Sequence, residues 1–236
     1  MTASVGSGSA RPPGRARAGL RAGAVRDAPE VARLHARHIP TGFLAVLGPR
    51  LLTRLYRRVA RTDDCFLLVA ERDGTIVGFL AGSLDTRRLM RRFVLLDGPA
   101  VIVSTGWEVL RHWRRVLETL GHGARRIQTD ETGVEEPASQ PEAELLAVAV
   151  DDGFRGSGLG STLTRAFLDE ATHRGAGSAR VVVGVANRQA IGMYRRCGFA
   201  TVEQFEHHRG AMSVLMRCSL ARPRAEQSPA ERGGPG

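Results

Sequence analysis

The sequence predicts an α/β fold in which a mixed central β-sheet is flanked by helices. Three observations support this prediction. Two pairs of strand-like runs, within residues 65–83 and 199–220, are each joined by a short polar turn, as in β-hairpins. Residues 143–151 and 179–185 are almost entirely apolar, and each run precedes a helical pattern, as in strand–helix crossover units. Because hairpins pair antiparallel and crossover units pair parallel, the sheet is expected to be mixed.

The N-terminal part of the predicted domain reads as one strand followed by two helices. Residues 20–26 can form the first strand. Asp27 is expected to cap a helix over residues 28–38, with Pro29 in its first turn. Residues 48–60 place leucines and a valine on one helical face and arginines on the other, which predicts an amphipathic helix.

The middle of the chain predicts a hairpin, an arginine-rich helical region and a loop. Residues 65–71 and 76–83 flank an Asp-Gly turn and form the hairpin. Residues 85–120 have a helical pattern, which ends in a helix over 105–120. The apolar stretch within this region suggests a buried helix pair. Residues 121–141 are polar and contain two prolines, so we expect a flexible loop.

The C-terminal part predicts a crossover unit and a final hairpin. The strand at 143–151 leads through a glycine-rich turn into a helix over 158–174. A strand at 179–185 precedes a short helix, for which Asn187 is a candidate N-cap and Gly198 a candidate C′ residue. Two further strands then complete the domain.

Composition indicates one domain with charged tails. The chain has 236 residues, of which 42% are hydrophobic, and its net charge of +10 comes entirely from arginine because lysine is absent. Residues 1–19 and 220–236 are rich in Gly, Pro, Ala and Arg, so we expect disordered tails around a domain at 20–219.

The charge and the cysteines limit the partners and compartments that we expect. The arginines are scattered and lack interleaved aromatic residues, which favours an anionic cofactor or substrate over nucleic acid. The longest apolar runs contain charged or helix-breaking residues, which argues against an integral membrane segment. Cys65, Cys197 and Cys218 include no CxxC pair, so neither a disulfide framework nor a metal site is expected. With no apolar signal near the N-terminus, these features favour the cytoplasm.

The turn Phe154–Ser161 raises the question of which phosphate group it would hold. Glycine-rich turns that open helices leave backbone N–H groups uncovered and add the positive end of the helix dipole. A P-loop needs a lysine, which is absent, and the dinucleotide fingerprint fails because its third glycine position is Ser161. The pattern R-x-x-G-x-G is satisfied by Arg155, Gly158 and Gly160.

Two blocks of sequence together resemble the GNAT superfamily of acetyl-CoA-dependent N-acetyltransferases. The first is LLAVAVDDGFRGSGLGSTLTRAFLDEA, which contains the glycine turn. The second is VVVGVANRQAIGMYRRCGF, whose spacing from Asn187 to Tyr194 and Phe199 is typical of the family. The resemblance implies a GNAT-like fold with splayed central strands and acetyl-CoA as co-substrate, without a metal.

The resemblance also implies how the cofactor is held. The pantetheine arm is expected to lie along the strand before the turn, and the diphosphate is expected to lie in the turn. The expected cofactor-binding residues are Val148, Ala149, Val150, Arg155, Gly156, Ser157, Gly158, Leu159, Gly160, Ser161 and Asn187. The side chain of Arg155 has two possible roles: contact with phosphate, or an ion pair with Asp151 or Asp152. The side chain of Asn187 can contact the cofactor, cap its helix, or do both.

Two residues are the expected catalytic groups. Tyr194 occupies the family position that donates a proton to the departing thiolate, and an ordinary phenol is protonated at neutral pH. Glu144 is the candidate base that deprotonates the amine, and strand alternation would place it on the face of Leu146, Val148 and Val150. A solvated strand end is the alternative for Glu144.

Other base positions are less favoured by the residues present. Some family members carry a glutamate five residues before the asparagine of the second block, where this chain has Val182. His207 and His208 are further candidates, and strand geometry lets at most one of them face the cleft.

The acceptor is expected to be a small-molecule amine, such as an amino sugar or an amino-acid-like amine. A peptide or protein N-terminus is the main alternative, and a non-catalytic acyl-CoA-binding module is a third hypothesis. The arginines in the helical region can contact an anionic substrate or form a solvated face, and these are Arg87, Arg88, Arg91 and Arg92. The sequence leaves both a monomer and a homodimer open.

Overall fold

The computed structural model describes residues 18–40, 48–105, 140–207 and 211–220. The strands in these ranges form one sheet in the order β1-β2-β3-β4-β5-β7-β6. They span Gly19–Ala22 (β1), Cys65–Arg72 (β2), Thr75–Ser83 (β3), Glu142–Val150 (β4), Ser178–Gly184 (β5), Ala200–His207 (β6) and Ala211–Ser219 (β7). β4 and β5 are parallel and all other neighbours are antiparallel, which confirms the mixed sheet.

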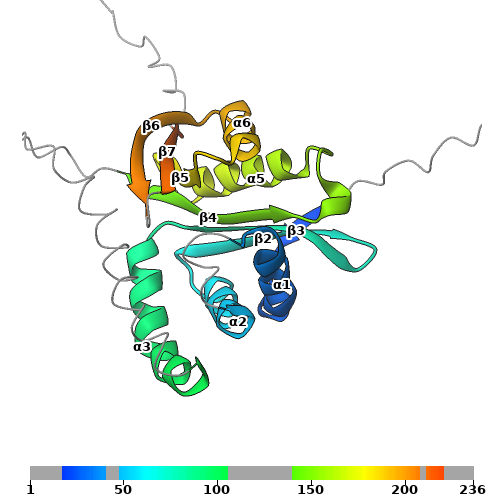
Figure 1. Ribbon diagram of the computed structural model, residues 1–236, viewed down its shortest axis with the longest axis vertical. Coiled ribbons are helices and arrows are strands. Elements are labelled where there is room, and N and C mark those ends of the chain that lie inside the picture. Colours follow the sequence, from blue (N-terminus) through cyan, green and yellow to red (C-terminus); the bar gives the residue numbers. More distant parts are fainter. Residues whose placement is uncertain (1–17, 41–47, 106–139, 208–210, 221–236) are drawn as a thin grey trace, which may run out of the picture.

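Helices cover both faces of this sheet (Figure 1). The α-helices described are α1 (Ala28–His38), α2 (Gly48–Val59), α3 (Thr86–Thr105), α5 (Leu159–His173) and α6 (Arg188–Arg196). One buried cluster joins α1, α2 and the start of α3 to sheet residues such as Phe79 and Ala149. A second cluster joins α5 and α6 to the opposite face, including Leu80 and Val181. The sheet therefore has an α1/α2 face and an α5/α6 face.

Helical periodicity explains which residues these helices bury. In α2, Leu51, Leu52, Leu55, Tyr56 and Val59 are buried while the arginines between them face outward. In α5 the buried apolar residues recur every four positions, at Leu159, Leu163, Phe167 and Ala171. Burial of such apolar stripes is the main force that holds the helices on the sheet.

The predicted hairpin of β2 and β3 is confirmed, together with its turn. Arg72 pairs with Thr75, so only Asp73 and Gly74 form the loop. Both have positive φ, 50° for Asp73 and 75° for Gly74. A type I′ turn needs this conformation at both positions, which explains the Asp-Gly signal.

The first strand is shorter than predicted, and Asp27 does not cap the helix that follows it. β1 ends at Ala22, and residues Val25–Asp27 form a 3₁₀ turn before α1. The Asp27 carboxylate accepts a hydrogen bond from the Ala24 N–H at 2.7 Å and pairs with Arg21 at 2.6 Å. It therefore caps the 3₁₀ turn, because Arg21 and Ala24 already occupy its oxygens.

The region after β3 also differs from the prediction. Thr86–Thr105 forms one helix, α3, in place of the start of a helix pair. Leu95 and Leu96 are 70% and 66% exposed, so the prediction of a buried pair is wrong at these positions. The predicted helix over 105–120 lies almost entirely outside the described residues, as do most of loop 121–141 and the two tails.

All three cysteines are buried and unpaired in the structure. Burial raises the pKa of the Cys65 and Cys218 thiols, because a thiolate is poorly solvated there. Within the described ranges, no helix has both the length and the apolar character that a membrane span requires.

Candidate active site

The parallel strands β4 and β5 separate soon after they begin. Only three pairs join them, and the last is Glu144 with Arg180. Beyond this pair β4 continues to Val150 and β5 to Gly184 without further pairing between them. The splayed central strands are thus confirmed, and we call the gap between residues 145–150 and 181–184 the β4–β5 opening.

A β-bulge in β4 determines which side chains face each side of this opening. Ala81 pairs with Ala147 and Gly82 with Leu145, so Leu146 is the extra residue. Leu145 packs in the α5/α6 cluster, whereas Ala147 packs in the α1/α2 cluster. The bulge therefore interrupts the two-residue alternation along the strand.

The bulge corrects the expected orientation of Glu144. Val148 and Val150 pack toward the α5/α6 cluster, while Leu146 packs toward the α1/α2 cluster. Glu144 precedes Leu145 and so projects from the α1/α2 face. The prediction that Glu144 shares a face with Val148 and Val150 is wrong, because strict alternation does not hold through a bulge.

The end of β4 leads into the glycine turn, residues 155–161. Gly156 and Gly158 have φ values of 74° and 87°, which L-residues with a side chain rarely adopt. Gly158 is the N-cap of α5 and its carbonyl accepts the first helical hydrogen bond, from Thr162 at 3.0 Å. Gly160 serves packing instead, since a Cβ there would lie 2.9 Å from the Met193 sulfur.

Not all amides of the glycine turn are open to a ligand. The N–H of Arg155 donates to Asp152 at 3.2 Å and that of Ser157 donates to Phe154 at 3.3 Å. At the start of α5, the N–H groups of Gly160 and Ser161 precede the first helical hydrogen bond and so lack an intrahelical acceptor. These amides and the positive end of the α5 dipole make the turn suitable for an anion.

The side chain of Arg155 pairs with carboxylate in the structure. Its Nε lies 3.1 Å from Asp152 Oδ1, and its Nη2 lies 3.0 Å from His38 Nδ1. Of the two roles weighed for this side chain, the observed contacts match the ion pair with Asp152.

The helix α6 is capped at both ends as its sequence predicts. Asn187 Oδ1 accepts a hydrogen bond from the Ala190 N–H at 3.1 Å. At the other end Gly198 has a φ of 96°, and Gly198 and Phe199 donate to the carbonyls of Arg195 and Tyr194. This Schellman arrangement ends the helix and leaves Phe199 against the Tyr194 ring, with ring centroids 5.6 Å apart.

Tyr194 is held beside the glycine turn by its neighbours on α6. Met193 lies against Gly160, and Cys197 Sγ lies 3.8 Å from the carbonyl oxygen of Ser161. Tyr194 itself is 4% exposed, and burial raises its pKa because the phenolate would be poorly solvated. No hydrogen bond to its hydroxyl is found within the described residues.

The sequence that forms this arrangement matches a known protein family. The model of the acetyltransferase (GNAT) family matches residues 35–199, which is more than half of the chain. The chain belongs to the GNAT family.

Individual relatives cover only part of the chain. An uncharacterized N-acetyltransferase of Methanocaldococcus jannaschii is 36% identical over 75 residues, which are 32% of this chain and 32% of that protein. A mycothiol acetyltransferase of Saccharomonospora viridis is 41% identical over 64 residues, 27% of this chain and 21% of its own length. The similarity thus spans about a third or less of these curated relatives.

A solved structure supports the GNAT fold over most of the chain. The ribosomal-protein-S18-alanine N-acetyltransferase from Escherichia coli superimposes with a TM-score of 0.53 at 14% identity. The match covers 88% of this chain and 97% of that structure. At this identity the likeness concerns the fold alone.

The GNAT candidate base Glu144 lies in a network of charges. Its carboxylate is 2.8 Å from Arg180, which also lies 3.4 Å from Glu142. Arg217 of β7 pairs with Glu142 at 2.6 Å. Arg180 was not among the site residues expected from the sequence, although it is the single charged residue in the apolar run of β5.

The structure gives less information about the other candidate base positions. His207 is the last residue of β6, and His208 lies outside the described residues. Val182, at the alternative glutamate position, is 44% exposed on β5.

One group of possible metal ligands lies next to the glycine turn. His38, Asp151 and Asp152 offer atoms within 4.8 Å of one another. Arg37 lies 3.6 Å from Asp152, and Arg155 lies closer still. These two arginines already neutralise the carboxylates, so the cluster is best described as an ion-pair network.

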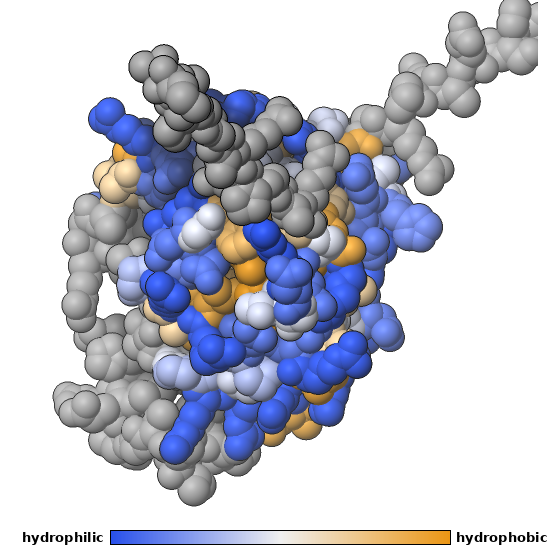
Figure 2. All heavy atoms as spheres, turned by 90° about the vertical axis from the view of Figure 1, so that its right-hand side faces the viewer, coloured by the Kyte–Doolittle hydropathy of each residue, from blue (hydrophilic) through white to orange (hydrophobic). Residues whose placement is uncertain are grey.

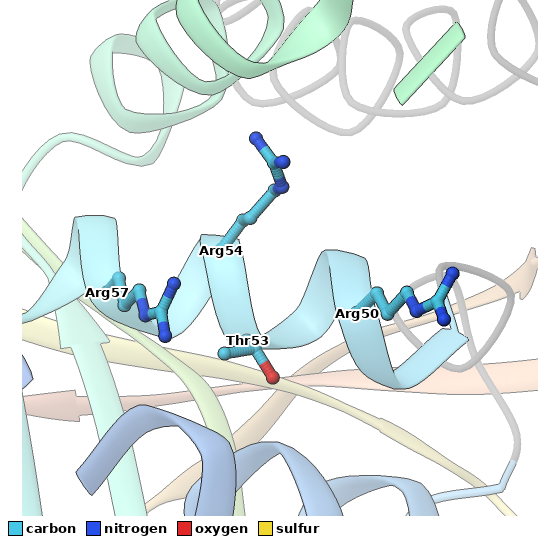
Figure 3. Close-up of a pocket in the computed structure, with 4 residues that line it drawn as sticks. All are labelled: Arg50, Thr53, Arg54 and Arg57. Carbon is cyan, nitrogen blue, oxygen red and sulfur yellow. The ribbon is translucent and has the colours of Figure 1, made fainter. Parts of the chain in front are cut away.

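A shallow hollow of about 260 Å³ lies on α2 (Figure 3). Its lining residues are Arg50, Thr53, Arg54 and Arg57. They lie on the solvent side of α2, and Figure 3 shows Arg54 pointing away from that helix. None of these lining residues belongs to the glycine turn or to the β4–β5 opening.

The end of the sheet that holds the glycine turn is shown in Figure 2. Apolar surface gathers in the middle of this view, with hydrophilic side chains around it. An apolar centre with a polar rim is typical of small-molecule sites.

Proposed function

We propose that the protein is an N-acetyltransferase that transfers the acetyl group of acetyl-CoA to a primary amine by direct attack. The observation that supports this most is that one end of the sheet combines three features. These are the β4–β5 opening, the glycine turn at the start of α5, and Tyr194 held against that turn.

The cofactor would extend from the opening to the turn. We propose that Val148, Ala149 and Val150 hydrogen-bond the pantetheine arm through their backbone, because in the described part of the chain no strand pairs with the β5 side of this segment of β4. The diphosphate would lie against the amides of the glycine turn, chiefly those of Gly156, Gly158, Leu159, Gly160 and Ser161. The Asn187 side chain caps α6 through Oδ1. Its NH2 group would donate a hydrogen bond to the pantetheine arm.

The chemistry requires a neutral amine and a protonated leaving group. The amine nitrogen attacks the thioester carbonyl carbon, the C–S bond breaks, the sulfur takes up a proton, and the nitrogen gives up one of its protons to become the amide nitrogen. We propose that the Tyr194 hydroxyl donates the proton, or a hydrogen bond, to the sulfur, and that the proton lost by the nitrogen balances this transfer. Because burial raises its pKa, Tyr194 remains protonated at neutral pH and can donate.

Glu144 is our proposed base for the ammonium form of the acceptor. It lies at the narrow end of the β4–β5 opening and projects from the α1/α2 face. The acceptor would therefore approach from that face, opposite α5 and α6, with Glu144 accepting its proton directly or through water.

We propose a small-molecule amine as the acceptor, with a peptide N-terminus as the second candidate. The named relatives include a mycothiol acetyltransferase and a ribosomal-protein-alanine acetyltransferase, so both classes occur among similar proteins. The exposed arginines Arg91 and Arg92 on α3 favour an acceptor that carries a negative group.

The first prediction tests the cofactor. Acetyl-CoA at about 100 times its dissociation constant should raise the free energy of unfolding by about 2.7 kcal/mol, because it binds only the folded state. Thermal melts with and without acetyl-CoA measure this, and NADH serves as the control ligand. An unchanged melting temperature at saturating acetyl-CoA would refute the cofactor proposal.

The acceptor is tested by thiol release from acetyl-CoA in the presence of amino sugars, amino acids, polyamines and N-terminal peptides. Release with a small amine supports the proposed class, and release with peptides alone supports the second candidate. Tight acetyl-CoA binding without release for any amine would instead indicate a non-catalytic module.

The second prediction concerns the glycine turn. Gly158→Ala should lower the free energy of unfolding by about 1–2 kcal/mol, because its φ of 87° is strained for a residue with a Cβ. It should also weaken acetyl-CoA binding, since the turn amides would shift. Urea denaturation and calorimetric titration measure the two effects.

Gly153 provides a matched control in the preceding 3₁₀ turn. A Cβ at Gly153 meets no atom within 4 Å, and its φ is not positive. Gly153→Ala should therefore leave both stability and acetyl-CoA affinity near those of the wild type. Equal losses in the two variants would contradict the role assigned to the Gly158 conformation.

A further inference from the structure

Four charged side chains meet where β4 and β5 begin to separate. Arg180 of β5 reaches Glu144 at 2.8 Å with Nη2 and Glu142 at 3.4 Å with Nη1. Glu142 is held in addition by Arg217 at 2.6 Å and by the Ser178 hydroxyl at 3.3 Å. The network therefore joins β4, β5 and β7 through side chains as well as backbone.

The position of this network in the sheet is specific. Glu144 and Arg180 are the last paired residues of the parallel ladder, directly before the β4–β5 opening. Opposed residues of neighbouring strands have their side chains close together, so Arg180 is directly beside the carboxylate. Arg180 and Glu144 are each 23% exposed, which makes the pair less screened by water than a surface ion pair.

We propose that Arg180 is a positioning residue that holds the Glu144 carboxylate at the narrow end of the opening. This inference rests on the proposed function, in which Glu144 is the base. Arg180 does not touch the substrate in this scheme, and it acts through Glu144.

Arg180 is the cation that reaches Glu144. Within the described residues the carboxylates that contact Arg180 are Glu144 and Glu142, and Glu142 is itself paired with Arg217. Burial lowers the pKa of Arg180, but the attraction of Glu144 and Glu142 outweighs it and raises the pKa overall. The guanidinium therefore stays charged and remains a hydrogen-bond partner of the Glu144 carboxylate.

The geometric part of the effect comes from the two contacts of one guanidinium. A planar guanidinium that reaches two carboxylates on the same strand restricts the rotamers of both. Glu144 is thus kept at the point where an amine entering from the α1/α2 face would meet the acetyl group in the opening. A lysine could supply the charge but not the second contact.

The test uses the full chain with Arg180→Gln and two measurements, kcat for thiol release and the KM for acetyl-CoA. Loss of Arg180 should lower kcat about 10-fold, because the Glu144 carboxylate is no longer held at the opening. The KM for acetyl-CoA should change little, since Arg180 does not touch the substrate.

Three variants separate this role from a structural one. When Glu144→Gln already removes the proposed base, adding Arg180→Gln should lower kcat no further. Arg180→Lys should restore the wild-type kcat in part, which keeps the test decisive if Arg180→Gln does not fold. Arg217→Gln removes a guanidinium that pairs with Glu142, and it should lower kcat less than Arg180→Gln does.

These measurements also distinguish the proposals. Wild-type kcat in Arg180→Gln, in an active protein, overturns the inference and leaves the proposed function standing. A further fall of kcat when Arg180→Gln is added to Glu144→Gln also overturns it, because Arg180 would then not act through Glu144. Absence of thiol release in the wild type contradicts the proposed function itself.

Discussion

Tyr194→Phe is expected to lower kcat for acetyl transfer about 100-fold while the affinity for acetyl-CoA stays nearly the same. Phenylalanine keeps the ring that packs against Phe199 and removes only the hydroxyl. Since no hydrogen bond to this hydroxyl is found within the described residues, its loss should cost little folding stability. Steady-state thiol release and calorimetric titration with acetyl-CoA measure the two quantities.

The chain offers a matched control, because it contains only two tyrosines. Tyr56→Phe removes a buried hydroxyl from the α1/α2 cluster, where it is bonded to His35. This control should lose stability and retain the wild-type kcat at temperatures where it is folded. Wild-type turnover in Tyr194→Phe, or an equal loss of kcat in Tyr56→Phe, would remove Tyr194 from the mechanism.

Stability is expected to fall by about 3 kcal/mol between pH 6.5 and pH 4 because of His35 alone. His35 is 1% exposed, and burial lowers its pKa from 6.5 to about 4. The folded state therefore disfavours the charged imidazole, and the unfolded state takes up the proton first. The contribution is fully present above pH 6.5 and is lost as the pH falls toward 4. Urea denaturation at a series of pH values measures it.

The size of this effect follows from the surroundings of His35. Its ring stacks near Phe79 and is hydrogen-bonded to the Tyr56 hydroxyl through Nδ1. Its Nε2 is buried, and none of the described residues is a hydrogen-bond partner for it. A charged imidazole in this apolar site would be neither solvated nor paired, which is costly. About 3 kcal/mol is a large part of the stability of an ordinary domain.

Variants identify His35 as the source of the acid sensitivity. His35→Leu combined with Tyr56→Phe removes both partners of the buried pair, so the loss of stability between pH 6.5 and 4 should become smaller by about 3 kcal/mol. His173 is exposed at the end of α5, and His173→Gln should behave like the wild type. Asp27, whose pKa is lowered mainly by its hydrogen bond to Arg21, adds acid sensitivity only at lower pH. An unchanged pH dependence in the double variant would reject this explanation.

Local features of the fold were predictable because they depend on residues close together in the chain. The Asp-Gly turn between β2 and β3 and the Asn187 cap of α6 follow from side chain and backbone preferences within four residues. The positive φ angles at Gly156 and Gly158 agree with the spacing of glycines before α5. These local signals were enough to locate the glycine turn and Tyr194.

The features that were not predictable depend on contacts between distant segments. Asp27 directly precedes α1 as predicted, but its side chain does not cap that helix, because Arg21 and the Ala24 N–H occupy its oxygens. Leu95 and Leu96 read as core residues from hydropathy, but the packing of α3 leaves them exposed. In both cases the outcome depends on which residues are neighbours in the folded chain.

The sequence by itself determined the family-like motifs, the mixed sheet and the order of its elements, since periodicity and turn residues act locally. The tertiary structure alone decided the surroundings of Glu144. Its partner Arg180 is 36 residues away, and the bulge at Leu146 arises from pairing with β3. Strand register and cross-strand ion pairs depend on the whole sheet, so no local pattern could have shown that Glu144 projects from the α1/α2 face beside an arginine.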